Sequence, residues 1–160
     1  MLTRARCELF EDKAPKTVAN FVGLASGTKE FRDPVTAAMT KRRAYDGTTF
    51  HRVLEGMYFQ GGDPSGRGDG EPGYVIDDEI WPGAKHDHVG LCMPNRGDPN
   101  TNGMQFLISL GPLTHLDGNY TIFGECGPRA ILEAIGEVPT KGEQPVTAVR
   151  VVTVTIRRGG

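Results

Sequence analysis

The sequence predicts a mainly β protein, an antiparallel barrel or sandwich that carries two helices. Of its 160 residues, 22 are glycine and 11 are proline, and this share of about a fifth favours many short elements joined by turns. Turn-forming pairs separate the alternating or apolar runs at Asp46-Gly47, Asn102-Gly103 and Asp117-Gly118. Because the chain has neither a linker nor an internal repeat, residues 1–160 are expected to form a single domain.

The first expected elements are a short strand over residues 5–10 and a helix that begins at Pro15. In this helix the apolar residues Val18, Phe21, Val22 and Ala25 recur at helical spacing, and Gly27 provides a stop. A second, shorter helix starts after Pro128 and ends at Gly136. Residues 31–43 have no regular period and are interpreted as a solvated loop.

The remaining apolar runs are expected to be strands. They cover residues 48–54, 57–60, 88–93, 104–110 and 120–125. The tail, residues 145–158, is rich in β-branched residues and is expected to form the last strand.

The charge balance and the cysteines indicate which partners and which compartment to expect. A net charge of −2 and a pI near 6.1 indicate neither a nucleic-acid partner nor an anionic membrane surface. Cys7, Cys92 and Cys126 form no CxxC pair, and an odd count leaves at least one free thiol. This favours a reducing compartment over a disulfide framework. A soluble cytoplasmic protein is therefore expected, and an exported form remains the alternative.

Two strands mix polar and apolar side chains on one face. Because side chains alternate along a strand, Phe50 and Arg52 are expected on one face, with His51 and Val53 on the other. By the same alternation, Gln105, Leu107 and Ser109 lie opposite Met104, Phe106 and Ile108. The pattern alone leaves two interpretations open: the polar groups line a site, or they satisfy buried backbone groups.

Other candidate sites have weaker support. Neighbours on a strand point to opposite faces, so His86, Asp87 and His88 are poorly arranged to share a metal, and no metal site is expected. The glycine-rich residues 61–73 lack the Lys-Ser/Thr ending of a phosphate loop. His51 is interpreted as a structural histidine.

Four blocks of the sequence, "FHRV", "QGGD", "PNTNGMQF" and "LDGNYTIFG", resemble the signature blocks of the cyclophilin-type peptidyl-prolyl cis–trans isomerases. The resemblance covers nearly the whole chain and is closest to bacterial, single-domain members. It implies a closed eight-stranded antiparallel β-barrel capped by two α-helices. It also implies a monomeric isomerase that needs no cofactor and acts on proline-containing peptides and folding proteins.

The resemblance also assigns site residues. Arg52 matches the catalytic arginine, and Gln60 and Gln105 match glutamines that line the active site. Asn95 matches a residue whose backbone binds extended peptide, and Pro94 precedes it. The proline pocket matches Met57, Tyr58, Leu107 and Leu116, whereas Phe106 is expected to point into the core.

The chain departs from the family pattern within this site. Met57 and Leu107 stand where phenylalanine is common, so the expected proline pocket is aliphatic. His115 replaces a tryptophan of cyclosporin-sensitive members, which predicts weak cyclosporin binding, and Tyr120 stands where histidine is frequent. The alternative function is a proline-peptide-binding module with weak or no catalysis. Because Arg52, Gln60, Gln105 and Asn95 are all present, catalysis is the favoured interpretation.

Overall fold

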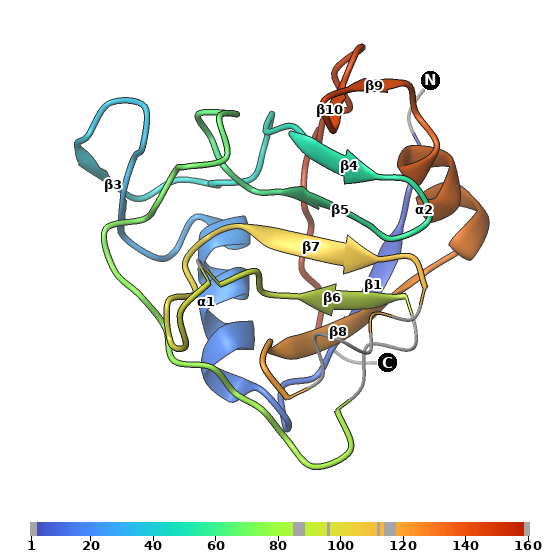
Figure 1. Ribbon diagram of the computed structural model, residues 1–160. Coiled ribbons are helices and arrows are strands. Elements are labelled where there is room, and N and C mark those ends of the chain that lie inside the picture. Colours follow the sequence, from blue (N-terminus) through green and yellow to red (C-terminus); the bar gives the residue numbers. More distant parts are fainter. Residues whose placement is uncertain (1–2, 85–88, 96, 112, 114–117, 159–160) are drawn as a thin grey trace.

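A six-stranded antiparallel sheet forms the centre of the protein (Figure 1). The computed structural model describes residues 3–84, 89–95, 97–111, 113 and 118–158. The order of strands across the sheet is β1-β8-β6-β7-β5-β4. Their bounds are β1 Arg6–Leu9, β4 Arg52–Leu54, β5 Tyr58–Gly61, β6 Gly90–Cys92, β7 Phe106–Ser109 and β8 Ile122–Gly127. These strands confirm the runs expected from the sequence, although most are shorter than the runs themselves.

Four shorter strands form two separate hairpins. β2 (Phe31–Arg32) pairs with β3 (Met39–Thr40), and β9 (Thr140–Lys141) pairs with β10 (Gln144–Pro145). Within the described ranges, the edge strands β1 and β4 do not pair with each other. The hydrogen bonds of the described residues therefore give an open six-stranded sheet, and the closure into an eight-stranded barrel stays a prediction.

Residues 31–43 were interpreted as a solvated loop; the exposure of residues 35–39 agrees with this, but the segment also contains the β2–β3 hairpin. Asp33 organises the turn: its carboxylate accepts hydrogen bonds from the Val35 amide at 2.8 Å and from Arg42 Nη2 at 2.9 Å. Strands of two residues are too short to show a hydrophobic period, so the sequence pattern did not reveal them.

The tail was expected to be the last strand, and this too needs correction. Beyond β10, Arg150 forms an isolated bridge with Thr49, and the other described tail residues have no strand assignment. Val151 nevertheless exchanges backbone hydrogen bonds with Gly47 and Thr48, both 2.7 Å long. The tail therefore runs beside residues 47–50 and pairs with them at only a few points.

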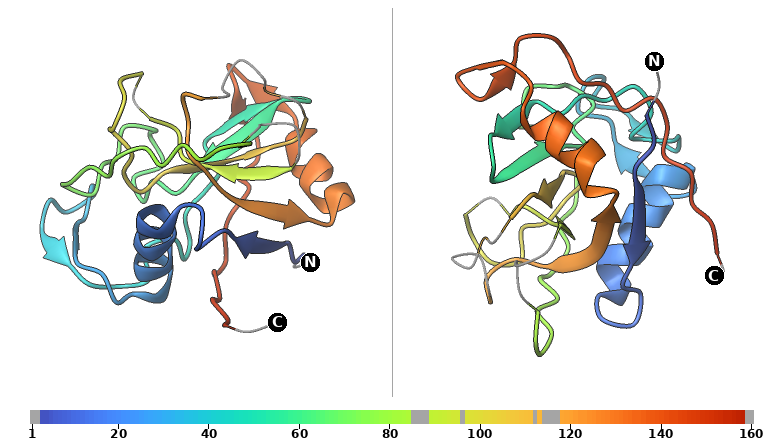
Figure 2. Two further views of the ribbon diagram at one scale, coloured as in Figure 1. Left: turned by 90° about the horizontal axis from the view of Figure 1, so that it is seen from below. Right: turned by 90° about the vertical axis from the view of Figure 1, so that its right-hand side faces the viewer.

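The two helices agree with the sequence. α1 (Pro15–Ser26) has proline in its first turn and ends at Gly27, whose φ of 80° is the left-handed conformation that glycine adopts at low cost. Its residues Val18 and Phe21 face the core. α2 (Arg129–Gly136) buries Leu132. α1 and α2 lie near opposite ends of the strands (Figures 1 and 2).

Aromatic rings fill the core between α1 and one face of the sheet. Phe21 stacks on Tyr45 with ring centroids 5.1 Å apart and meets Phe106 edge-on at 5.5 Å. The buried Tyr45 hydroxyl donates a hydrogen bond to the carbonyl of Met104 at 2.8 Å. Phe106 thus points into the core, as expected. The core occupies this face of the sheet and leaves the other face for a site.

The expected alternation holds in β7 but not before β4. Met104, Phe106 and Ile108 all belong to the main core, whereas Leu107 packs in a separate cluster. Phe50 was expected beside Arg52, but it packs edge-on against Phe59 with ring centroids 4.8 Å apart, in the same core as Val53. The prediction was wrong because β4 begins at Arg52, so strand alternation does not extend back to Phe50.

Two of the three cysteines form a disulfide and the third is a free thiol. Cys7 of β1 and Cys126 of β8 oppose each other in the register and form a disulfide, and Cys92 is a buried free thiol. The expected free thiol is confirmed, but the disulfide removes the argument for a reducing compartment. Among the described helices, none has the length and apolar character needed to cross a membrane.

Candidate active site

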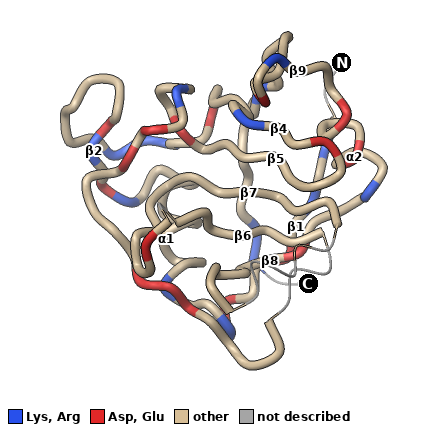
Figure 3. Tube along the Cα trace, viewed as in Figure 1, with Lys and Arg blue, Asp and Glu red and all other residues tan. Residues whose placement is uncertain are grey.

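One row of side chains crosses five strands on the face opposite the main core. The register pairs Arg52 with Gln60, Gln60 with Leu107, and Leu107 with Cys92, and Cys92 pairs in turn with Ile122. Directly opposed residues in a sheet point to the same face. We call these five residues the Arg52 row. Arg52 is the one charged residue within β4, β5, β6 and β7, and Figure 3 shows the other three strands free of charge.

Arg52 lies at the surface end of this row. Its side chain is 43% exposed, so the guanidinium is outside the core. Nε donates a hydrogen bond to Glu143 Oε2 at 2.7 Å, and the guanidinium carbon lies 5.5 Å from the centroid of the Tyr58 ring. The bond to Glu143 is the main cause that raises the pKa of Arg52 above its usual value, against a smaller opposing effect of burial. Arg52 therefore stays charged.

The two glutamines of the site are joined to each other. Gln60 Nε2 donates a hydrogen bond to Gln105 Oε1 at 2.9 Å. Gln105 Nε2 donates in turn to the carbonyls of Gly68 and Gly70, at 3.0 and 3.2 Å. The two glutamines thus connect the Arg52 row to residues 68–70, and Gln105 also satisfies buried backbone groups. Of the two interpretations that the sequence left open, the structure confirms for Gln105 that it satisfies buried backbone groups, and its place in a site stays a prediction.

Asp63 holds the same loop from its other side. Its carboxylate accepts hydrogen bonds from the amides of Ser65, Gly68 and Gly70, each 2.8 Å long. Burial alone would raise the pKa of Asp63, but these bonds and one from the Ser65 hydroxyl outweigh it, so the pKa lies below its ordinary value. Residues 64–70 are therefore fixed beside the site by an ionised, fully buried side chain.

Next to Arg52 and Gln60, the row is apolar. Leu107, Cys92 and Ile122 form a buried cluster, against which Tyr58 and Trp81 pack. Leu107 is 3% exposed, so it serves as a floor and Tyr58 as a partly exposed wall. Trp81 is held in place because its Nε1 donates a hydrogen bond to the Ile122 carbonyl at 2.9 Å. This arrangement offers an apolar seat beside a fixed cation.

The other expected site residues lie around the row or outside the described ranges. Asn95 follows β6, and its Nδ2 donates a hydrogen bond to the Asn119 carbonyl at 3.2 Å, which ties the half-buried segment of Pro94 and Asn95 to the residue before Tyr120. Met57 lies in the β4–β5 turn and is 37% exposed. His115 and Leu116, like the rejected metal candidates at 86–88, are outside the described residues.

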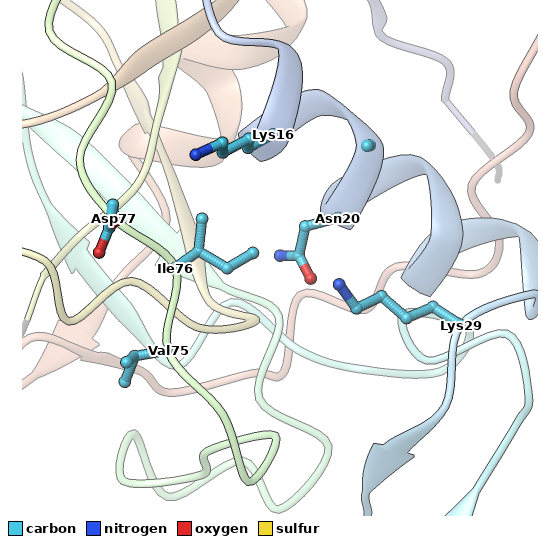
Figure 4. Close-up of a pocket in the computed structure, with 7 residues that line it drawn as sticks. Lys16, Asn20, Lys29, Val75, Ile76 and Asp77 are labelled. Atoms are coloured by element: carbon cyan, nitrogen blue, oxygen red, sulfur yellow. The ribbon is translucent and has the colours of Figure 1, made fainter.

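A pocket lies away from the row. It is a cavity of about 430 Å³ between α1 and residues 75–77 (Figure 4). The side chains around it include Lys16, Asn20, Lys29, Val75, Ile76 and Asp77. None of them belongs to the Arg52 row, and the buried Asn20 is already satisfied by Tyr74 and Gly103. The Arg52 row, which joins a cation to an apolar surface, is therefore the candidate site.

The sequence pattern missed two residues of this site. Glu143 contacts Arg52 from 91 positions away, and no local spacing links the two. Trp81 packs on the cluster that contains Leu107, but it comes from an irregular segment. In both cases only the tertiary fold brings the residues together.

The fold and the row define a β-sheet protein whose surface site combines one arginine, two linked glutamines and an apolar seat. The model of the cyclophilin type peptidyl-prolyl cis-trans isomerase family matches residues 2–156, so the chain belongs to this family. Peptidyl-prolyl cis-trans isomerase A of Mycobacterium tuberculosis is 43% identical over 152 residues, which cover 92% of this chain and 84% of the relative. Peptidyl-prolyl cis-trans isomerase B of Streptomyces anulatus is 43% identical over 155 residues, covering 92% and 87%.

Solved structures give the same result. A cyclophilin type peptidyl-prolyl cis-trans isomerase of Cryptosporidium parvum, crystallised in the presence of the dipeptide Ala-Pro, matches with a TM-score of 0.82 and 31% identity. The match covers 97% of this chain and 93% of that structure. The protein is thus a mainly β isomerase with the cyclophilin fold, and its substrates are X–Pro bonds in peptides and proteins.

Proposed function

We propose that Arg52 accelerates rotation about the X–Pro bond by donating a hydrogen bond to the prolyl nitrogen in the twisted transition state. The barrier to rotation is roughly 18–20 kcal/mol, because the nitrogen lone pair is delocalised into the carbonyl. In the twisted state the nitrogen becomes pyramidal and regains this lone pair. A fixed donor aimed at the nitrogen therefore binds the transition state better than either planar ground state.

The position of Arg52 carries this proposal. It stands outside the core, directly opposite Gln60 and one strand further from Leu107. A hydrogen bond to a charged group contributes about 1.5–3 kcal/mol. Since about 1.4 kcal/mol corresponds to a tenfold change in rate, Arg52 would raise the isomerisation rate about ten- to hundredfold. No covalent bond is broken, so the reaction needs no nucleophile, metal or cofactor.

The rest of the acceleration comes from holding the proline ring while the preceding carbonyl turns. Leu107 and Tyr58 would hold the ring at the apolar seat, with Met57 and Leu116 completing the aliphatic pocket. Gln60, Gln105 and the backbone of Asn95 would anchor the peptide on either side, near Pro94 and Tyr120. The linked amides of Gln60 and Gln105 and the partly exposed Tyr58 ring support this assignment.

Replacement of Arg52 tests the proposal. Arg52→Ala should lower turnover of an Ala-Pro peptide at least tenfold, and the peptide dissociation constant should change much less. Arg158→Ala is a control, because this arginine pairs with Glu11 at the surface and its side chain is 84% exposed. Unchanged isomerisation in Arg52→Ala would refute the role given to the guanidinium. Peptide binding without isomerisation by the unmodified protein would favour the alternative, a proline-binding module.

We further propose that the chain acts as one domain, residues 1–160, and as a monomer. Light scattering would test the oligomeric state.

Cyclosporin binds weakly, because His115 stands in place of the family's tryptophan. Competition of cyclosporin against the peptide would test this. The tail closes the barrel between β1 and β4; the partly buried Val154 and Ile156 support this. Hydrogen exchange of their amides should then be slow.

A further inference from the structure

Glu143 reaches Arg52 from a hairpin that lies over the edge of the sheet. The turn between β9 and β10 contains Gly142 and Glu143, and the hairpin lies beside β4 (Figure 1). The peptide carbonyl of Glu143 accepts a hydrogen bond from the Val53 amide at 2.7 Å. The carboxylate accepts a second bond, from Arg52 Nε, also at 2.7 Å. Two neighbouring residues of β4 are therefore held by one residue of the hairpin.

The bond to Nε fixes the direction of the guanidinium. Nε is the atom of the planar guanidinium that joins it to the aliphatic stem, so a bond there restrains rotation of the whole plane. The Tyr58 ring, 5.5 Å from the guanidinium carbon, adds a second restraint. In the part of the chain that the structure describes, the hydrogen bond of Arg52 uses Nε alone. The two terminal amino groups are thus left to donate toward a substrate.

Stability does not explain this contact. The Arg52 and Glu143 side chains are 43% and 49% exposed, and ion pairs with such exposure contribute little to folding. The backbone conformation at position 143 does not favour glutamate either. Gly142 and Glu143 have φ values of 59° and 72°, a left-handed pair in a two-residue hairpin loop where glycine is the least strained choice. The side chain of Glu143 therefore sits on a backbone that disfavours it.

We propose that Glu143 is a positioning residue of the isomerase, which holds the Arg52 guanidinium in the direction that catalysis needs. The inference rests on the proposed role of Arg52. Glu143 touches neither the substrate nor the reacting nitrogen. It restrains the rotation of the Arg52 guanidinium before the peptide twists, so that the guanidinium need not reorient in the transition state.

Replacement of Glu143 by glycine tests this, because Glu143→Gly removes the carboxylate and relieves the left-handed backbone. We expect an unchanged or raised melting temperature, an unchanged Ala-Pro peptide affinity, and a turnover lowered about three- to tenfold. Glu143→Gln keeps an oxygen that accepts the Nε hydrogen bond, so it should stay within about twofold of the unmodified protein. Lys141→Ala, an exposed change in the same hairpin, is the control and should leave turnover unchanged.

Two outcomes would overturn the inference. One is full turnover in Glu143→Gly, and the other is a turnover in Glu143→Gln as low as in Glu143→Gly, since acceptor geometry would then not be what matters. The double variant Arg52→Ala/Glu143→Gly separates this question from the role of Arg52. It should be no slower than Arg52→Ala alone, and a further loss would show that Glu143 acts independently of the guanidinium. If Arg52→Ala itself keeps full turnover, the proposed mechanism fails whatever Glu143 does.

Discussion

Gln60 of β5 and Gln105, the residue before β7, are joined by a hydrogen bond that the Nε2 of Gln60 donates to the Oε1 of Gln105 at 2.9 Å. Because Gln105 also donates to the carbonyls of Gly68 and Gly70, one buried amide joins the sheet to a surface loop. The loop of residues 68–70 is therefore part of the same hydrogen-bonded network as the Arg52 row.

Gln105→Leu should weaken this network. The leucine leaves the Gly68 and Gly70 carbonyls without their donor, and buried unsatisfied groups cost about 1–3 kcal/mol. We expect a loss of this size in the free energy of unfolding, measured by urea denaturation, and weaker peptide binding. Gln144→Leu, at an exposed position of the β9–β10 hairpin, should change little. Equal stability of the two variants would contradict the role of Gln105.

Gly70→Ala should destabilise the loop directly. A Cβ at Gly70 would collide with the Asp63 carboxylate that accepts the Gly70 amide hydrogen bond. Overpacking of this kind costs about 1–3 kcal/mol. Gly111→Ala is a matched control, since its Cβ would meet the nearest atom at an ordinary contact distance of 3.6 Å. Thermal unfolding of both variants would check this, and a Gly70→Ala protein as stable as the control would show that the loop readily moves aside.

Leu107→Ala should damage both the seat and the fold. Leu107 is 3% exposed and packs with Cys92 and Ile122, so truncation leaves a cavity and costs about 2–5 kcal/mol. Leu107→Met conserves volume and should cost less than about 1.5 kcal/mol. Under conditions where both variants are folded, Ala-Pro peptide titration should show weaker binding to Leu107→Ala only. Similar affinities would mean that Leu107 does not support the proline ring.

His51 should make stability depend on pH. Burial lowers the pKa of His51 below its ordinary value, against an opposing effect of Asp63, and its Nδ1 is buried without a hydrogen-bond partner among the described residues. The folded state therefore favours neutral His51, whereas the unfolded chain takes up a proton near pH 6.5. Between the two pKa values the unfolded state binds more protons, so this contribution is complete above pH 6.5 and is lost as the pH falls through that window.

Urea denaturation at pH 7.5 and pH 5.5 measures this effect. The loss of stability between these values should be smaller in His51→Gln, which has no titrating ring, than in the unmodified protein. Keeping the pH above 5 leaves out Asp63, because its lowered pKa makes its contribution vanish only at more acidic values. An equal loss in both proteins would contradict the assignment to His51.

The elements that the sequence predicted well have a long apolar period or clear turn residues at their ends. α1 has three turns of apolar spacing between Pro15 and Gly27, and the central strands are separated by turn residues. The tail was interpreted wrongly because its pairing depends on contacts distant in sequence, such as Val151 with Thr48, whereas the β2–β3 hairpin was missed because each of its strands has only two residues. The Cys7–Cys126 disulfide likewise joins residues 119 positions apart.

The candidate site shows the same limit. Alternation in β7 correctly separated Leu107 from Phe106, and the family resemblance indicated Arg52, Gln60 and Gln105. Alternation failed at Phe50 because the strand begins two residues later. Glu143 could not be found, since a glutamate in a hairpin turn has no pattern that indicates which side chain it meets.

The central claim is that the Arg52 guanidinium stabilises the twisted transition state. The most direct measurement is the cis–trans exchange rate of a saturating Ala-Pro peptide by NMR, with the unmodified protein, Arg52→Lys and Arg52→Ala. We expect Arg52→Ala to lose at least tenfold in exchange rate at saturation and Arg52→Lys to recover only part of it, because an ammonium lacks the planar array of donors. An Arg52→Ala protein that exchanges the bound peptide as fast as the unmodified protein would show that the guanidinium does not stabilise the transition state.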